Sequence, residues 1–155
     1  MSVDLCRWTL TEGADSGYLG CPDMGDADLD LSPLRKVLAS LELALAQPKT
    51  EFIRDSVIQR FEYTYELSWK LLKRHLENDE GVENIDQLTR KQLFRVALEK
   101  GLIRTVEDWF AYHRVRNNTA HAYNESTAEE VYETAIRFAP EVRALLEEIE
   151  RRTNA

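Results

Sequence analysis

An arginine, a histidine and a tyrosine lie within eight residues of one another, at Arg116, His121 and Tyr123. A guanidinium offers a planar fork of donors that matches phosphate oxygens, and a histidine with a pKa near its usual value of about 6.5 can donate or accept a proton. On RNA, such a pair could activate a 2′-hydroxyl and stabilise charge on phosphorus without a metal. We therefore take Arg116, Asn117, His121 and Tyr123 as candidate substrate-binding residues, with Arg116 and His121 as the catalytic pair if the chain cleaves RNA.

The same residues also have a purely structural interpretation. Arg116, Asn117 and His121 could cap the C-terminal end of a helix, where cationic side chains are favoured, and Asn124 could be a turn residue. Spacing alone favours neither interpretation, because short polar motifs recur by chance.

Two amphipathic helices are predicted upstream of this polar segment. The first begins near Ser32, an N-cap candidate with Pro33 at the first helical position, and ends before Pro48. The second spans about residues 51–76 and ends at a polar loop, residues 78–87. Its apolar stripe recurs at helical spacing and consists of Val57, Phe61, Tyr65, Trp69, Leu72 and Leu76.

Three further helices are indicated by their start signals. The third helix has a capping box, Thr89-x-x-Gln92, and ends at Gly101. The fourth helix starts at Thr105-x-x-Asp108, and the fifth opens with a capping box at Thr127-x-x-Glu130. Pro140 lies inside the fifth helix and should kink or interrupt it, because proline lacks an N–H. Since no segment resembles a strand, the sequence predicts an all-α, up-and-down antiparallel bundle of about five helices.

Several other side chains on these helices have simple interpretations. Tyr65 and Trp69 are expected to pack in the core or at a dimer contact, and Glu66 lies four residues before Lys70, which is a favourable order for an ion pair. The short basic group Lys70, Lys73 and Arg74 is typical of a hydrated helix face. A positive rim near the motif is possible if the third and fourth helices are neighbours, made by Arg90, Lys91, Arg95 and Arg104.

The charge of the chain is concentrated at its N-terminal end. Residues 1–30 hold seven acids and one base, whereas the other 125 residues hold 21 acids and 19 bases. We interpret residues 1–28 as a flexible acidic tail, or as an extension if translation starts at Met24, and residues 29–153 as one helical domain. The near-neutral domain does not exclude contact with RNA, but it offers no broad basic face either.

Composition also bears on the cellular compartment of the protein and on metal or cofactor binding. Two cysteines at Cys6 and Cys21 form no zinc-site spacing, and His75 and His113 have no acidic or cysteine partner at ligand spacing. We expect no metal and no cofactor. Without a signal sequence or a long apolar segment, we expect a cytoplasmic protein that does not enter a membrane.

Three strings in the chain resemble known sequences. Arg116-x4-His121-x-Tyr123 is similar to the R-x(4–6)-H-x-Y signature of the HEPN superfamily. The strings Phe61-Glu-Tyr-Thr-Tyr-Glu-Leu-Ser-Trp-Lys70 and Arg116-Asn-Asn-Thr-Ala-His-Ala-Tyr-Asn-Glu125 resemble the nucleotidyltransferase substrate-binding protein family within that superfamily. The resemblance covers about residues 29–150.

This resemblance implies a helical bundle that dimerises and is encoded beside a minimal nucleotidyltransferase. In the related HepT toxins, the Arg and His of the motif cleave RNA, and the cognate enzyme adenylylates the motif tyrosine, which corresponds to Tyr123. A nucleotidyltransferase of this kind needs a Gly-Ser motif followed by paired Asp residues that hold magnesium on a sheet. The Asp-rich stretch at residues 23–30 lacks the Gly-Ser motif and a flanking strand, so we expect that the chain is not itself the transferase.

We thus expect a partner subunit of a nucleotidyltransferase in a toxin–antitoxin-type pair, a homodimer or higher oligomer that binds a nucleotide or RNA. The alternatives are a metal-independent ribonuclease toxin that uses Arg116 and His121, and a helical dimer with a vestigial motif.

Overall fold

The computed structural model describes residues 29–154, so the predictions for residues 1–28 lie outside the described part of the chain. Between residues 29 and 154 there are five α-helices and no strand, which confirms the all-α prediction. The helices are α1 (Ser32–Leu45), α2 (Glu51–Asn78), α3 (Arg90–Glu99), α4 (Val106–Asn118) and α5 (Glu125–Thr153). Two short 3-10 turns, η2 (Ile85–Gln87) and η3 (Thr119–His121), precede α3 and α5.

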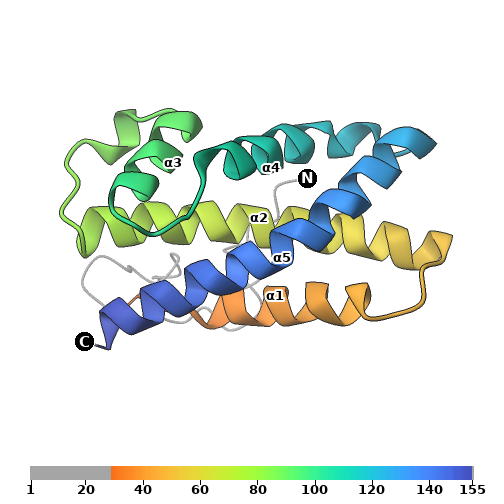
Figure 1. Ribbon diagram of the computed structural model, residues 1–155, viewed down its shortest axis with the longest axis horizontal. Helices are drawn as coiled ribbons and strands as arrows, with labels where there is room; N and C mark the ends of the chain where they lie inside the picture. Colours follow the sequence, from red (N-terminus) through yellow and green to blue (C-terminus); the bar gives the residue numbers. More distant parts are fainter. Residues whose placement is uncertain (1–28, 155) are drawn as a thin grey trace, which may run out of the picture. The chain divides into compact units, whose positions relative to one another are not determined.

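Helix α2 is the centre of the bundle and contacts each of the other four helices. Figure 1 shows α1 lying along one side of α2, α3 and α4 along the other, and α5 crossing α2 at an angle. The short connections make α1 and α2, and likewise α4 and α5, antiparallel neighbours. The candidate motif lies where α4 turns into α5.

An aromatic cluster joins α2, α4 and α5. Phe138 of α5 has its ring centroid 5.0 Å from that of Phe61 on α2 and 5.0 Å from that of Tyr112 on α4, in edge-on arrangements that aromatic rings favour. Trp109 of α4 is edge-on to Phe138 as well, at 5.9 Å. All four side chains are buried. This cluster fixes α4, and therefore the start of the motif, against the rest of the bundle.

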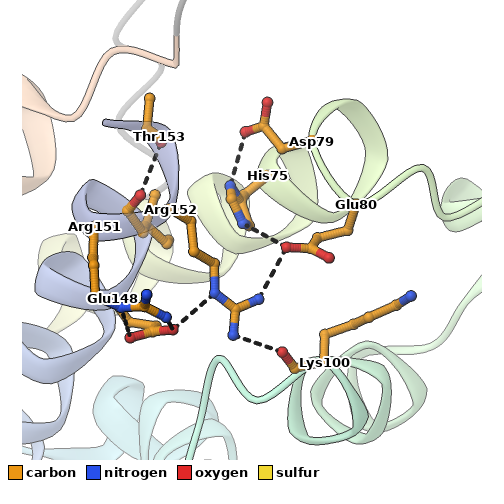
Figure 2. Close-up of polar contacts among 9 residues, drawn as sticks. His75, Asp79, Glu80, Lys100, Glu148, Arg151, Arg152 and Thr153 are labelled. Carbon is orange, nitrogen blue, oxygen red and sulfur yellow. Dashed lines mark hydrogen bonds and ion pairs between the residues drawn. The ribbon is translucent and has the colours of Figure 1, made fainter. Parts of the chain in front are cut away.

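The C-terminal end of α5 is held by a polar cluster of charged side chains (Figure 2). Arg152 donates to Glu148 at 2.8 Å, to Glu80 at 2.9 Å and to the carbonyl of Lys100 at 2.7 Å, so it joins α5 to the end of α2 and to the loop after α3. The buried imidazole of His75 lies 2.8 Å from Asp79 and 3.4 Å from Glu80, so the prediction that His75 has no acidic partner is wrong. Hydrogen bonds from Arg152 keep the pKa of Glu80 below its usual value.

Most helices begin and end near the residues that the sequence predicts. The Thr89 hydroxyl accepts from the backbone N–H of Gln92, and the Gln92 side chain accepts from the N–H of Thr89, so the predicted capping box is confirmed. Gly101 follows α3 with a φ of +74°, a conformation that favours glycine. Helix α2 extends two residues beyond the predicted end, to Asn78.

Two local predictions are wrong, and one of two predicted outcomes at Pro140 does not occur. Ser32 is the first residue of α1 and not its N-cap, because the carbonyl of Leu31 already accepts from Arg35. Helix α5 starts at Glu125, since the Asn124 side chain caps it by accepting from the N–H of Ser126, and the box at Thr127 therefore does not form. Of the kink or interruption predicted at Pro140, the interruption does not occur.

The continuity of α5 has a simple explanation. Proline at position 140 leaves the carbonyl of Ile136 without its helical donor. Both side chains are on the exposed side of the helix, so water can satisfy that carbonyl.

Candidate functional site

The candidate motif forms a tight reversal between α4 and α5. Arg116 lies in the last turn of α4, His121 ends the 3-10 turn η3, and Tyr123 lies in the link to α5. The backbone N–H of Ala122 donates to the carbonyl of Thr119 at 3.1 Å, and the N–H of Asn124 donates to that of His121 at 3.0 Å. These bonds fix the backbone on which the histidine and the tyrosine lie.

His121 and Tyr123 lie beside each other at the surface. Their ring centroids are 6.2 Å apart and the rings meet edge-on. Tyr123 is 88% exposed, and His121 is also exposed. In the described part of the chain neither side chain makes a hydrogen bond, so both the phenol oxygen and the imidazole nitrogens can meet a partner molecule.

Arg116 has a different environment. Its side chain is only 20% exposed, and its Nε lies 3.4 Å from Oε1 of Glu66 on α2. Its Nη1 donates to the Thr119 hydroxyl at 3.4 Å, and that hydroxyl in turn donates to the Arg116 carbonyl at 2.8 Å. Among the described residues Arg116 has no polar contact with His121 or Tyr123. The structure therefore pairs the histidine with the tyrosine and turns the arginine toward α2.

Asn117 belongs to a second polar group, on the side of α4 that faces α2 and α3. Its Nδ2 lies 3.5 Å from Nε2 of His113, and the Nδ1 of His113 is 2.7 Å from the hydroxyl of Tyr65. Arg90, the first residue of α3, donates to the same hydroxyl at 3.2 Å. Sequence spacing gives no signal for this group, because its members come from three helices.

The protonation states within this second group follow from burial. Burial raises the pKa of Tyr65 to about 12, so its phenol is neutral. Burial also lowers the pKa of His113, and the nearby Arg90 lowers it further. The Tyr65 oxygen accepts from Arg90 and lies within hydrogen-bond distance of Nδ1 of His113.

Glu66 connects the second group to the motif. It accepts from Nε1 of Trp69 at 3.1 Å through one carboxylate oxygen and contacts Arg116 through the other. The predicted Glu66–Lys70 ion pair is therefore wrong: Arg116 is less exposed than Lys70, and charges attract more strongly where less water screens them. Trp69, expected to pack, is only half-buried and is covered by the guanidinium of Arg90, 3.4 Å from the ring centroid.

An ion cluster at the start of α5 fixes the motif turn to α2. Arg54 donates to Glu125 at 2.5 Å and to Glu129 at 3.0 Å, and Lys49 contacts Glu129 at 2.5 Å. The side chain of Arg54 is almost fully buried, whereas Glu125 is largely exposed. Because Glu125 is two residues after Tyr123, this cluster restricts how far the tyrosine can move.

Residues 29–154 hold no group of three or more His, Cys, Asp or Glu side chains that could bind a metal ion. Nor does any helix of that part combine the length and apolar character needed to span a bilayer. The motif presents an exposed phenol and imidazole, while its guanidinium is turned toward Glu66 of α2.

The protein is thus an all-helical bundle that exposes a His–Tyr pair at the reversal between α4 and α5. A family model described as nucleotidyltransferase substrate binding protein like matches residues 29–151. The chain belongs to this family, as its sequence strings indicate.

Individual relatives agree with the family assignment. A probable ribonuclease HepT of Haemophilus influenzae is 34% identical over 137 residues, which are 80% of this chain and 94% of that protein. A solved structure from the same organism, described as the fold of a substrate-binding domain of a nucleotidyltransferase, is 33% identical with a TM-score of 0.72 and covers 78% of this chain and 99% of its own. A crystal structure from Thermus thermophilus is 34% identical, has a TM-score of 0.68, and covers 75% of this chain and 98% of its own.

Proposed function

We propose that this chain is the helical partner subunit of a separately encoded nucleotidyltransferase and presents Tyr123 to that enzyme as a nucleotidyl acceptor. The observation that carries the proposal is the exposure of Tyr123, 88%, on a turn that is otherwise fixed by backbone hydrogen bonds and by the Arg54–Glu125 ion pair. A modifying enzyme needs an accessible hydroxyl at a defined position, and Tyr123 provides one.

The family supports the same proposal. Its description and that of the Haemophilus structure both refer to substrate binding for a nucleotidyltransferase. We assign the transferase to another chain because residues 29–154 contain no sheet that could carry its paired aspartates. Two copies of this chain, acting in the cytoplasm, would offer two Tyr123 side chains to the enzyme.

The proposed step is a nucleotidyl transfer. The phenol oxygen of Tyr123 attacks the α-phosphorus of a nucleoside triphosphate held by the transferase, a new O–P bond forms, and pyrophosphate leaves with the electron pair of the broken bond. The phenol proton passes to a base, for which the adjacent imidazole of His121 is the candidate on this chain. In a toxin–antitoxin-type pair, this bulky anionic group would block the motif.

The test is co-expression with the nucleotidyltransferase encoded next to this chain, followed by intact-mass measurement and peptide mapping. We expect a mass increase of one nucleoside monophosphate on Tyr123 and none in Tyr123→Phe. Tyr63→Phe is the matched control, because Tyr63 is a half-buried tyrosine of α2 that is outside the motif. An adduct that persists in Tyr123→Phe, or its absence from the wild-type pair, would reject the proposal.

A second candidate is a metal-independent ribonuclease that uses Arg116 and His121. It is favoured by the 34% identity to the probable ribonuclease HepT. Because Arg116 contacts Glu66 in the single chain, this function requires either a rotation of Arg116 or an arginine from a second copy. It predicts that expression of the chain alone arrests growth and that His121→Ala relieves the arrest. Intact RNA at high protein concentration, with harmless expression, would exclude it.

A further inference from the structure

Three helices bring a group of cations together next to the motif. Arg90 and Lys91 begin α3, Arg116 lies in the last turn of α4, and all three lower the pKa of His113. Among the strongest charges around His113, only Glu66 is negative. Since Glu66 already contacts Trp69 and Arg116, it does not neutralise the cations of α3.

The cations of α3 lie over aromatic rings instead of pairing with carboxylates. The guanidinium of Arg90 is 3.4 Å from the centroid of Trp69, and Lys91 and Arg95 each lie 5.5 Å from the centroid of Phe110. None of the three makes an ion pair within residues 29–154. By contrast, three of the four arginines of α5, Arg143, Arg151 and Arg152, each pair with a glutamate.

A hollow of about 240 Å³ opens beside this group, between α2 and the start of α3. It is lined by Trp69 and Lys73 of α2, Asp86 of η2, and Thr89 and Arg90 at the start of α3, together with apolar side chains. Lys73 and Asp86 pair with each other, so Arg90 supplies the uncompensated charge. About eight water molecules occupy this volume in liquid water. The hollow therefore suits one planar ring system better than a protein helix.

We propose that Trp69, Arg90, Lys91, Phe110 and Arg95, here called the α3 face, bind a single-stranded polynucleotide, with phosphates on the cations and one base in the hollow. Cations interleaved with aromatic rings are the combination that single strands recognise, because every base has a flat face and every linkage a charge. A flat acidic protein surface would satisfy the cations but would leave the hollow unfilled.

The α3 face also connects to the motif. Arg90 donates to Tyr65, Tyr65 contacts His113, and His113 lies against Asn117, which precedes the motif turn. The proposal goes beyond the transfer to Tyr123, which needs no polynucleotide, and the two can fail independently.

The experiment measures fluorescence anisotropy of fluorescein-labelled oligouridylate and oligothymidylate with the full chain, over a series of salt concentrations. All proteins carry His121→Ala to prevent cleavage. Each lost phosphate contact should lower the slope of log affinity against log salt by about 0.7. For Arg90→Gln/Lys91→Gln we expect a slope smaller by about 1.4 and an affinity about 25-fold lower at about 0.1 M salt.

Two further variants make the result decisive. Lys91→Gln/Arg95→Gln changes only exposed side chains and keeps the Arg90–Tyr65 contact, so a loss of binding there is not a folding defect. Arg143→Gln/Arg151→Gln removes the same charge from the exposed side of α5 and should change affinity less than twofold.

Binding of either oligonucleotide with this pattern supports the proposal, and the comparison of the two shows whether the sugar matters. Absence of binding by the parent protein, or an equal loss in the α5 control, overturns it. Retained oligonucleotide binding with lost binding of the nucleotidyltransferase in the α3 variants also overturns it, because the α3 face would then be a protein interface. Nucleotidyl transfer to Tyr123, measured on the same α3 substitutions with His121 restored, should be unchanged.

Discussion

Replacement of Phe138 by alanine should be the most informative test of the packing that positions α4. The Phe138 ring is fully buried and is the only one in the described part of the chain that contacts Phe61, Trp109 and Tyr112 together. Its removal would leave a cavity between α2, α4 and α5, because the surrounding rings are themselves packed against other helices.

The expected cost follows from the burial and the ring contacts. Phe→Ala in a core costs about 3–5 kcal/mol, and the edge-on contacts at 5.0 Å to Phe61 and Tyr112 favour the upper half of that range. With a urea m-value of about 1.5 kcal/mol/M, a loss of about 4 kcal/mol lowers the unfolding midpoint by roughly 2.7 M. Urea unfolding followed by far-UV circular dichroism measures this directly.

Phe52→Ala is the matched control, because Phe52 is a phenylalanine of α2 that is 85% exposed. We expect its unfolding free energy to change by no more than about 0.5 kcal/mol. If Phe138→Ala proved as stable as Phe52→Ala, Phe138 would not be at the centre of the core, and the positions of Arg116 and Asn117 on α4 would have to be revised.

Two further predictions concern the neighbouring contacts. Burial lowers the pKa of His113, so its neutral form contributes stability that is complete above the pKa of the unfolded state, about 6.5, and is lost as the pH falls through the pKa of the folded state. The difference in unfolding free energy between wild type and His113→Gln should therefore shrink from pH 8 to pH 5. A constant difference would contradict the buried position of His113. Gly101→Ala should lower the thermal midpoint more than Gly81→Ala does, since both have positive φ values but only at Gly101 would the new Cβ meet Nη2 of Arg152, at 3.2 Å. Equal shifts in the two variants would show that the Arg152 contact adjusts without cost.

Local sequence rules predict the helices well, because the contacts that define a helix join residues three or four apart. The apolar stripe of α2 is confirmed except at the half-buried Trp69, and the capping box at Thr89 and the stop at Gly101 are confirmed as well. Where two local signals compete, sequence alone misses the outcome. Asn124 and Thr127 can both start a helix, and the earlier residue caps α5.

The candidate site is only partly predictable for a related reason. The sequence places Arg116, His121 and Tyr123 within eight residues, but it does not tell which way each side chain turns. Glu66, 50 residues before Arg116, draws that guanidinium toward α2 and leaves His121 and Tyr123 as the exposed pair. The Glu66 carboxylate therefore pairs with Arg116 and not with Lys70.

Periodicity, caps and short strings lie along one chain, so they are sufficient to predict the five helices, the family and the position of the polar motif. The meeting of Tyr65, Arg90 and His113 depends on helix packing, because these residues come from three helices and no local spacing relates them. The hollow beside Trp69 likewise exists only because α3 packs across α2. Charge and aromatic surface from distant segments combine into a binding face through helix packing, which a local pattern does not encode.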